Sequence, residues 1–278
     1  MVDHSGFGAL LARLLDSRQA DMAWLASASG VPESELWSVT GGEPPSVAQL
    51  EGLAAGLGFR TADLLVIAGV PVPESLELCE PATGRELEAL IGIALALPSD
   101  QRARVRETVE QLPQLLAARP ADPPRTFFRR DGRAGSMLVT MLCANRNLYS
   151  SVAAVKTLAR MTRGRMYVAA STLHSISAGR TALKPAWLAG FAIVLGIPAA
   201  DLAAITGIDP PEPLPPDDPP VTDMAELLWA CRRLTTNQIE HVHREAKAMF
   251  VEVPADASDD DWNRVYKQNE TWWGAPRR

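Results

Sequence analysis

Cationic and hydroxyl side chains gather in one short stretch of the sequence, and their types suit contact with a nucleic acid. Guanidinium and ammonium groups pair with phosphate oxygens, whereas small polar side chains can reach the edges of bases. Arginines next to a short polar helix could grip phosphates or a groove edge. The alternative is an ordinary solubilising loop. The candidate contact residues are Arg160, Arg163, Arg165, Tyr167, Ala170, Ser171, Thr172, His174, Ser175, Arg180 and Lys184.

The net charge of −6 conceals a strong asymmetry along the 278 residues. Residues 125–210 contain 11 basic and 3 acidic side chains, a net charge of +8. Residues 1–124 contain 8 basic and 17 acidic side chains, and residues 211–278 contain 8 basic and 13 acidic ones, which gives −9 and −5. A cationic segment between two anionic ones is the footprint expected of a single surface that faces a polyanion.

The sequence shows no motif typical of a catalytic site, a metal site or a membrane-spanning segment. The chain lacks a GxxxxGK[ST] loop and an HExxH pair, so we expect no enzymatic activity and no cofactor, although scattered catalytic residues would leave no such pattern. Cys79, Cys143 and Cys231 stand in no ligand spacing, which favours a reduced cytoplasmic setting without a metal. The longest apolar runs, such as 87–97, are too short to cross a bilayer, so no membrane partner is expected.

The segments that contain and follow the candidate residues are predicted to form short helices. Leu173 and Ile176 give one helix an apolar side, and Gly179 ends it because glycine tolerates the left-handed backbone of a helix terminus. An apolar helix then runs over 185–195 and stops at Gly196. We therefore predict a polar short helix that is anchored by two apolar side chains and followed by a buried helix.

This order of helices resembles the third to fifth helices of a lambda-repressor-like (XRE-family, Cro-type) helix-turn-helix domain. The resemblance implies an all-α fold and a short helix that lies in the DNA major groove. The chain departs from the family at the start of that helix, where Gln is frequent in the family and Ala169 and Ala170 stand here. Base reading would then fall to Ser171, Thr172, His174 and Arg180, with methyl contacts from Ala170. The outward face on this interpretation is formed by Ser171, Thr172, His174 and Ser175.

The same pattern occurs earlier, at residues 31–64, and residues 90–105 likewise parallel 227–242 at an offset of 137. Chance similarity between Ala- and Leu-rich helices is the alternative to a duplicated unit. Relative to the first copy, about seven residues are inserted before the short helix, around 159–167. The matched pairs are Ser34 with Ser171, Leu36 with Leu173, Gly42 with Gly179, Gly58 with Gly196 and Asp63 with Asp201.

We therefore predict two lambda-repressor-like helix-turn-helix domains, each followed by a helical hairpin. Arg102, Arg104 and Arg106 are expected on a solvated face of the first hairpin. The predicted parts are a first helix-turn-helix domain at 1–70, a linker and hairpin at 71–118, a basic connector at 119–135, a second helix-turn-helix domain at 136–208, a Pro-rich linker at 209–221, and a hairpin with an aromatic tail at 222–278.

The first copy differs from the second in the chemistry of its short helix. Glu33 and Glu35 would face phosphates of like charge, so we expect this copy to keep the fold without the DNA surface. Dimerisation or partner binding would be its role, and an exposed Trp37 would serve such an interface, whereas a buried Trp37 would be core. Trp24 and Leu25 are expected in the core.

The favoured function is a sequence-specific transcriptional regulator of the tandem, actinobacterial kind, with double-stranded DNA as its partner. A homodimer is expected because one module buries little DNA surface, with the hairpins or the tail as its interface. The alternative is a protein-interaction module, such as an antitoxin or antirepressor, that binds through the first copy or the tail. A ligand-sensing regulator with a pocket between the hairpins is a third class. Alanine at Arg163 and Arg165, but not at Arg13 and Arg18, should abolish DNA binding.

Overall fold

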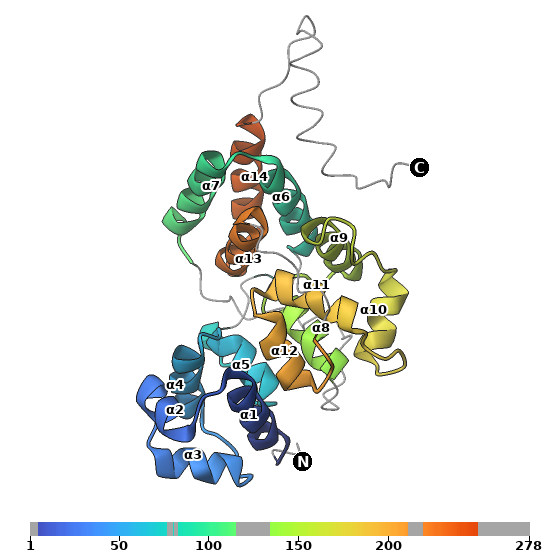
Figure 1. Cartoon of the computed structure of the whole chain (residues 1–278). Helices are drawn as coiled ribbons and strands as arrows, with labels where there is room; N and C mark the ends of the chain where they lie inside the picture. The colour runs from blue at the N-terminus through green and yellow to red at the C-terminus, as the bar shows by residue number, and fades with distance from the viewer. Residues whose placement is uncertain (1–4, 77–79, 81–82, 115–133, 211–218, 250–278) are drawn as a thin grey trace, which may run out of the picture.

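The computed structural model describes residues 5–76, 80, 83–114, 134–210 and 219–249, and this part of the chain is all-helical (Figure 1). It contains fourteen α-helices and one 3-10 helix, with no β-strand among the described residues. In these ranges, too, no helix combines the length and apolar character that a membrane span requires. Most of the predicted basic connector, most of the Pro-rich linker and the aromatic tail lie outside the described residues.

Two runs of five helices correspond to the repeated pattern. We call them the first unit and the second unit. The first unit consists of α1 (Ser5–Arg18), α2 (Met22–Ser29), α3 (Glu33–Thr40), α4 (Val47–Leu57) and α5 (Thr61–Ile67). The second unit consists of α8 (Ala134–Ala144), α9 (Ser151–Met161), α10 (Ala170–Ser177), α11 (Pro185–Leu195) and α12 (Ala199–Thr206).

A helical hairpin follows each unit in the chain. The first hairpin, preceded by the 3-10 helix η1 (Glu74–Leu76), consists of α6 (Gly84–Ala96) and α7 (Ser99–Gln111). The second consists of α13 (Pro219–Cys231) and α14 (Thr236–Ala248).

The helix boundaries repeat at the offsets seen in the sequence. Helices α3 and α10 begin and end 137 residues apart, as do α7 and α14, and α4 and α11 are 138 apart at both ends. Gly58 and Gly196 end α4 and α11 in the left-handed region, with φ of 70° and 66°. Gly8 and Gly135 allow equally close helix packing, since a Cβ there would lie 2.7 Å from Val39 O and 2.5 Å from Ile176 O. The repeat thus extends to turns and close contacts.

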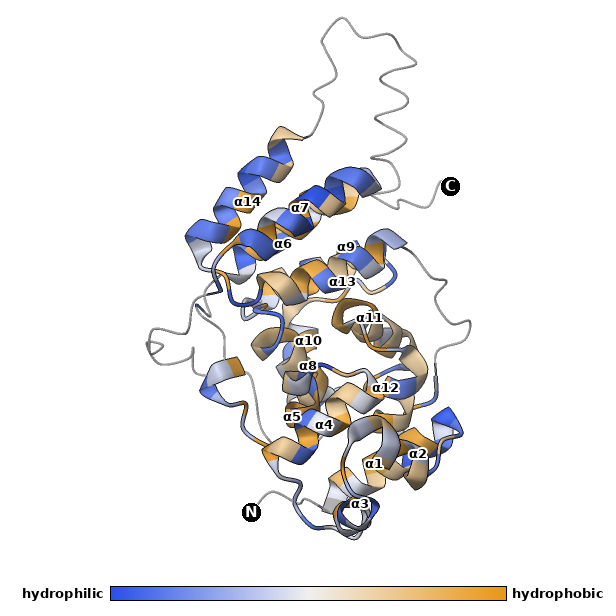
Figure 2. Ribbon diagram, turned by 90° about the vertical axis from the view of Figure 1, so that its left-hand side faces the viewer, coloured by the Kyte–Doolittle hydropathy of each residue, from blue (hydrophilic) through white to orange (hydrophobic). Residues whose placement is uncertain are grey.

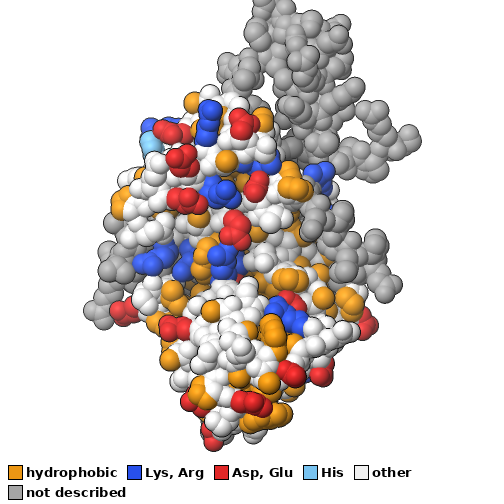
Figure 3. All heavy atoms as spheres, turned by 60° about the vertical axis from the view of Figure 1, so that its left-hand side comes forward, with side chains coloured by type: hydrophobic (Ala, Val, Ile, Leu, Met, Phe, Trp, Pro, Cys, Tyr) orange, Lys and Arg blue, Asp and Glu red, His pale blue; other side chains and the backbone are white. Residues whose placement is uncertain are grey.

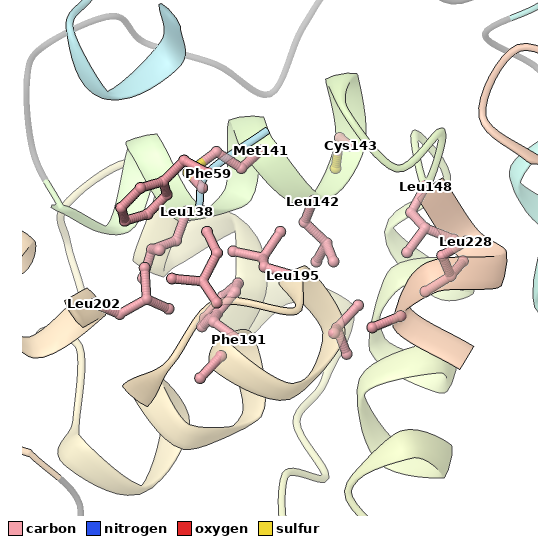
Figure 4. Packing of buried hydrophobic residues seen from close by; sticks show 14 of the residues in the cluster. Phe59, Leu138, Met141, Leu142, Cys143, Leu148, Phe191, Leu195, Leu202 and Leu228 are labelled. Atoms are coloured by element: carbon pink, nitrogen blue, oxygen red, sulfur yellow. The ribbon is translucent and has the colours of Figure 1, made fainter. Parts of the chain in front are cut away.

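The two units pack on each other through corresponding helices. Helix α1 contacts α12, and α8, the counterpart of α1, contacts α5, the counterpart of α12. Such reciprocal use of one patch is the property of a two-fold interface, here formed inside a single chain. Figure 4 shows Phe59 of the first unit beside Leu138 and Met141 of α8, so the two cores are continuous at this contact.

Each unit also contributes one arginine–aspartate pair to this interface. Arg18 Nε and Nη2 donate to Asp201 Oδ1 and Oδ2 at 3.0 and 2.6 Å. Arg146 Nη1 and Nη2 donate to Asp63 Oδ1 and Oδ2 at 2.8 Å each. In both cases an arginine at or just beyond the end of the first helix of one unit binds an aspartate in the fifth helix of the other. The Arg146 pair is buried to 1% and 0% exposure, whereas Arg18 keeps 24%.

The hairpins pack against each other as four helices at one end of the molecule (Figure 1). Arg102, predicted on a solvated face, is instead buried between them, because its Nε donates to Asp223 Oδ2 of the second hairpin at 3.0 Å. Arg106 keeps the expected exposed pairing, with Glu110. Since the hairpins cover each other within one chain, the faces that they share are already occupied.

Helix α11 lies at the centre of the second unit. Its sequence is apolar around the whole circumference, as the ribbon coloured by hydropathy shows (Figure 2), and such a helix is stable only when buried. It packs against α8, α9, α12 and α13, and so joins the second unit to the second hairpin. This helix fixes the position of the loop that carries the candidate arginines.

Candidate nucleic-acid interface

The residues inserted before α10 form a fastened loop. Thr162 Oγ1 donates to Leu158 O at 2.7 Å and accepts from Met166 N at 2.9 Å. The Met166 side chain is 1% exposed and lies on Gly190 of α11, where any Cβ would collide with its Sδ. Arg163 takes a left-handed φ of 52°, which closes the turn after α9. The loop is therefore held at both its start and its end.

Three of the candidate side chains are exposed on this loop. Arg163 and Arg165 are exposed, and Tyr167 is 85% exposed. Arg165 Nε donates to Thr162 O at 3.2 Å, which limits the freedom of its side chain near the turn. The structure thus brings two cations and an aromatic ring together directly before α10.

Helix α10 buries Leu173 and Ile176, as expected for its inward face. Ser171 is exposed, while the remaining four candidate residues of this helix are half-buried. Its outward face is therefore narrower than the sequence suggested. The half-buried residues are Ala170, Thr172, His174 and Ser175.

Two further candidate cations follow α10. Arg180 and Lys184 are both exposed in the turn that leads into α11. Gly179 gives this turn its left-handed residue, with φ of 65°. Lys184 Nζ lies 4.9 Å from the centroid of the Trp187 ring, an arrangement that holds the ammonium group by cation–π attraction. Cations thus stand on both sides of α10 along the chain.

Arg160 is not part of this surface. Its Nη1 donates to Glu88 O at 2.9 Å and forms an ion pair with the carboxylate of Glu88, which is 6% exposed. The physical reason is the length of α9, which continues to Met161 and so includes Arg160, whereas the sequence predicts an insertion from about residue 159. Arg160 therefore lies in the last helical turn against α6 and joins the second unit to the first hairpin. Sequence reasoning also missed Lys156, an exposed cation of α9 that is visible in the charge count alone.

Exposed charges on the second unit are all cationic within residues 134–206. The one carboxylate in this range, Asp201, is taken up by Arg18 of the first unit. The exposed charged residues are Lys156, Arg163, Arg165, Arg180 and Lys184.

The first unit shows the opposite distribution over residues 5–70. It has no lysine, and its three arginines all contact the second half of the chain. Arg13 donates to Ala204 O and Ile205 O at 2.9 and 3.0 Å, Arg18 binds Asp201, and Arg60 pairs with Glu226. The exposed carboxylates are Asp16, Asp21, Glu33, Glu35, Glu43 and Glu51.

Aromatic side chains lie among these carboxylates. Trp37 is 58% exposed, and its Nε1 donates to Glu33 Oε1 at 3.2 Å. Trp24, predicted in the core, is 43% exposed, whereas Leu25 is fully buried. Among the coloured side chains at the lower end of the face seen in Figure 3, where the first unit lies, most are acidic or hydrophobic. The outward face of α3 is thus both anionic and aromatic.

Other groups offer little reactivity. Burial raises the pKa of the Cys143 thiol, and it raises that of Cys231 to about 12, so both stay neutral near pH 7. A cluster of residues suited to a metal ion is not found among the described residues. An open cavity of about 360 Å³ lies between the ends of α4 and α11, not between the hairpins, and Arg60 and Glu226 line it.

Comparison of the chain with protein-family models, curated proteins and solved structures finds no match. The surfaces are therefore interpreted from their own geometry and charge.

Proposed function

We propose that the second unit binds double-stranded DNA and that the chain is a transcriptional regulator built from two lambda-repressor-like helix-turn-helix units. The observation that carries this proposal is the set of exposed cations around α10 without any exposed carboxylate in residues 134–206. Affinity for DNA rests mainly on contacts between cations and phosphates. A surface of this kind, next to a short helix with a polar outward side, fits that requirement.

Roles within the surface follow from exposure. Arg163, Arg165, Arg180 and Lys184 contact phosphates on either side of the groove that receives α10. Ser171, the exposed residue of α10, reads a base edge, assisted by the partly covered polar residues of the same helix. Because few side chains reach bases, phosphate contacts contribute most of the affinity, and discrimination between sequences is modest.

The test is an anisotropy titration of a labelled duplex with the full chain at several salt concentrations. Log affinity should fall steeply with log salt, and Arg163→Ala/Arg165→Ala should reduce the slope by about 2, since each phosphate contact contributes about 1. Arg104→Ala/Arg106→Ala is the matched control, because it removes the same charge from exposed positions of the first hairpin. Arg13 and Arg18 are unsuitable controls, since both bind the second unit. Equal losses in both variants, or affinity that is independent of salt, would refute the proposal.

A second role, contact with a protein, is favoured for the first unit by the exposure of Trp37 amid carboxylates. Aromatic residues are enriched in protein interfaces, and carboxylates repel phosphates. One chain already contains two paired units, as a homodimer of single units would. Homodimerisation of the whole chain is therefore a separate prediction, to be measured by sedimentation.

A further inference from the structure

Complementary outward charges on the two units raise the question of what the first unit binds. In residues 5–70 every basic side chain is directed to the second half of the chain, and in residues 134–206 the one carboxylate is directed to the first. The basic side chains of the first unit and the carboxylate of the second unit are therefore both engaged in contacts within the molecule. What remains outside is an anionic face on one unit and a cationic face on the other.

We propose that the α3 face of one chain docks on the cationic face around α10 of a second copy, so that copies associate head to tail. This proposal builds on the protein-contact role of the first unit. The α3 face is defined by Glu33, Glu35, Trp37 and Glu43, and the cationic face by Arg163, Arg165, Tyr167, Arg180 and Lys184.

Charge and aromatic chemistry both favour this occupant. Opposite potentials across an interface steer association and fix its register. Trp37, at 58% exposure, offers a ring face to a guanidinium group, and Tyr167, at 85% exposure, offers a second ring within the cationic face. A partner for an anionic and aromatic surface must be cationic, and this chain itself presents such a surface.

The two faces of one chain do not lie against each other. In Figures 1 and 2, α3 lies at the lower end of the molecule and α10 lies apart from it, beside α8. Contact between the faces therefore needs two copies. Because the joined surfaces differ, the association is heterologous, and it continues as a ring or an open series of copies instead of stopping at a closed pair. DNA and the second copy would compete for the same cations.

The experiment is sedimentation velocity of the full chain at about 0.01 M and about 1 M salt, where the Debye length is about 30 Å and about 3 Å. We expect assemblies at low salt and monomers at high salt. Glu33→Lys/Glu35→Lys and Arg165→Glu/Arg180→Glu should each be monomeric at low salt. An equimolar mixture of these two variants should assemble again, because the reversed faces complement each other.

Two controls separate docking from general charge effects. Glu107→Lys/Glu110→Lys changes the net charge as much as the α3 variant but at exposed positions of the first hairpin, so it should still assemble. Trp37→Ala leaves the charge unchanged and should weaken assembly, which keeps the test informative if the lysines disturb α3. Monomers at low salt, or a mixture that stays monomeric, would overturn the proposal.

A short duplex added to the assembled chain distinguishes this inference from the proposed function. Dissolution of the assemblies into DNA-bound monomers supports both. Assemblies that persist because the duplex does not bind refute the DNA role and leave the docking in place. Binding of the duplex by a chain that is monomeric at low salt refutes the docking alone.

Discussion

Helices α3 and α10 occupy the same place in their units, yet their outward sides differ in charge and in exposure. Both bury two apolar side chains, Leu36 and Val39 in α3 and Leu173 and Ile176 in α10. Glu33, Ser34, Glu35 and Trp37 of α3 are exposed, whereas Ser171 alone is exposed at the four matching positions of α10. The difference teaches that a small apolar set and a few glycines hold this scaffold, while the solvent side of each copy is free to take a different role.

The turns before these helices differ as well. Three residues, 30–32, separate α2 from α3, and Gly30 makes the turn with φ of 68°. Eight residues, 162–169, separate α9 from α10 and carry the exposed arginines. A helix-turn-helix turn normally needs three to four residues, so the longer loop is an addition to the scaffold.

The largest expected difference between the units concerns their two ion pairs. Asp63→Ala leaves Arg146 fully buried without its carboxylate, and removing one partner of a buried pair costs about 3–5 kcal/mol. Asp201→Ala leaves Arg18 at 24% exposure, where water reaches the guanidinium, so a loss of about 1–2 kcal/mol is expected. Urea unfolding of the two variants measures both values. Equal losses would show that burial does not distinguish the pairs.

Matched glycines give the next comparison. A Cβ on Gly52 would lie 2.6 Å from the backbone oxygen of Ser29, so Gly52→Ala should cost about 1–3 kcal/mol by overpacking. The same change at Gly190 meets the flexible Met166 side chain, which can move, and therefore costs less stability. Because Met166 anchors the end of the loop, we expect this movement to shift the loop, so Gly190→Ala should weaken DNA binding while Gly52→Ala should not. Thermal unfolding and anisotropy separate the effects, and a reversed order in either would contradict the assignment.

The smallest expected effect lies in the hairpins. Burial, followed by the charge of Lys247, lowers the pKa of His243 in α14, whereas its counterpart in α7 is Arg106. A histidine with a lowered folded pKa takes up a proton on unfolding, so stability should decrease slightly as pH falls through about 6.5, the unfolded value. Because the amide of His243→Asn does not titrate, the wild type should lose stability relative to this variant as pH falls below about 6.5, and the two unfolding titrations should separate at low pH. A wild type that gains stability on acidification relative to the variant would be inconsistent with this shift.

Much of the scaffold could be read from the sequence because its signals are local. Glycines at helix ends and the spacing of Leu173 and Ile176 locate the short helix and the turn, and the repeat offset transfers these limits to the other copy. Ion pairs between the two halves of the chain could not be predicted from the sequence. Arg146 and Asp63 are 83 positions apart, and no local pattern couples them.

The sequence also could not predict which side chains of a short helix are exposed. An eight-residue helix such as α2 makes about two turns, so its period does not decide whether Trp24 or a neighbour faces inward. Arg160 falls within the insertion that the comparison of the two copies predicts around 159–167, but it lies in the last turn of α9, and its contact with Glu88 depends on how α6 packs. The exposure of candidate residues in a loop or turn was therefore easier to predict than that of candidate residues near helix ends.

The reciprocal contact between the units has a consequence for how this molecule can change. In an assembly of identical subunits, each substitution appears on both sides of the symmetry axis, so one side cannot become acidic while the other becomes basic. When both partners belong to a single polypeptide, the tether keeps them at a high effective concentration and lets each be altered independently. Covalent union thus makes a lopsided pair possible, with dissimilar surfaces held at a fixed relative orientation even in very dilute solution.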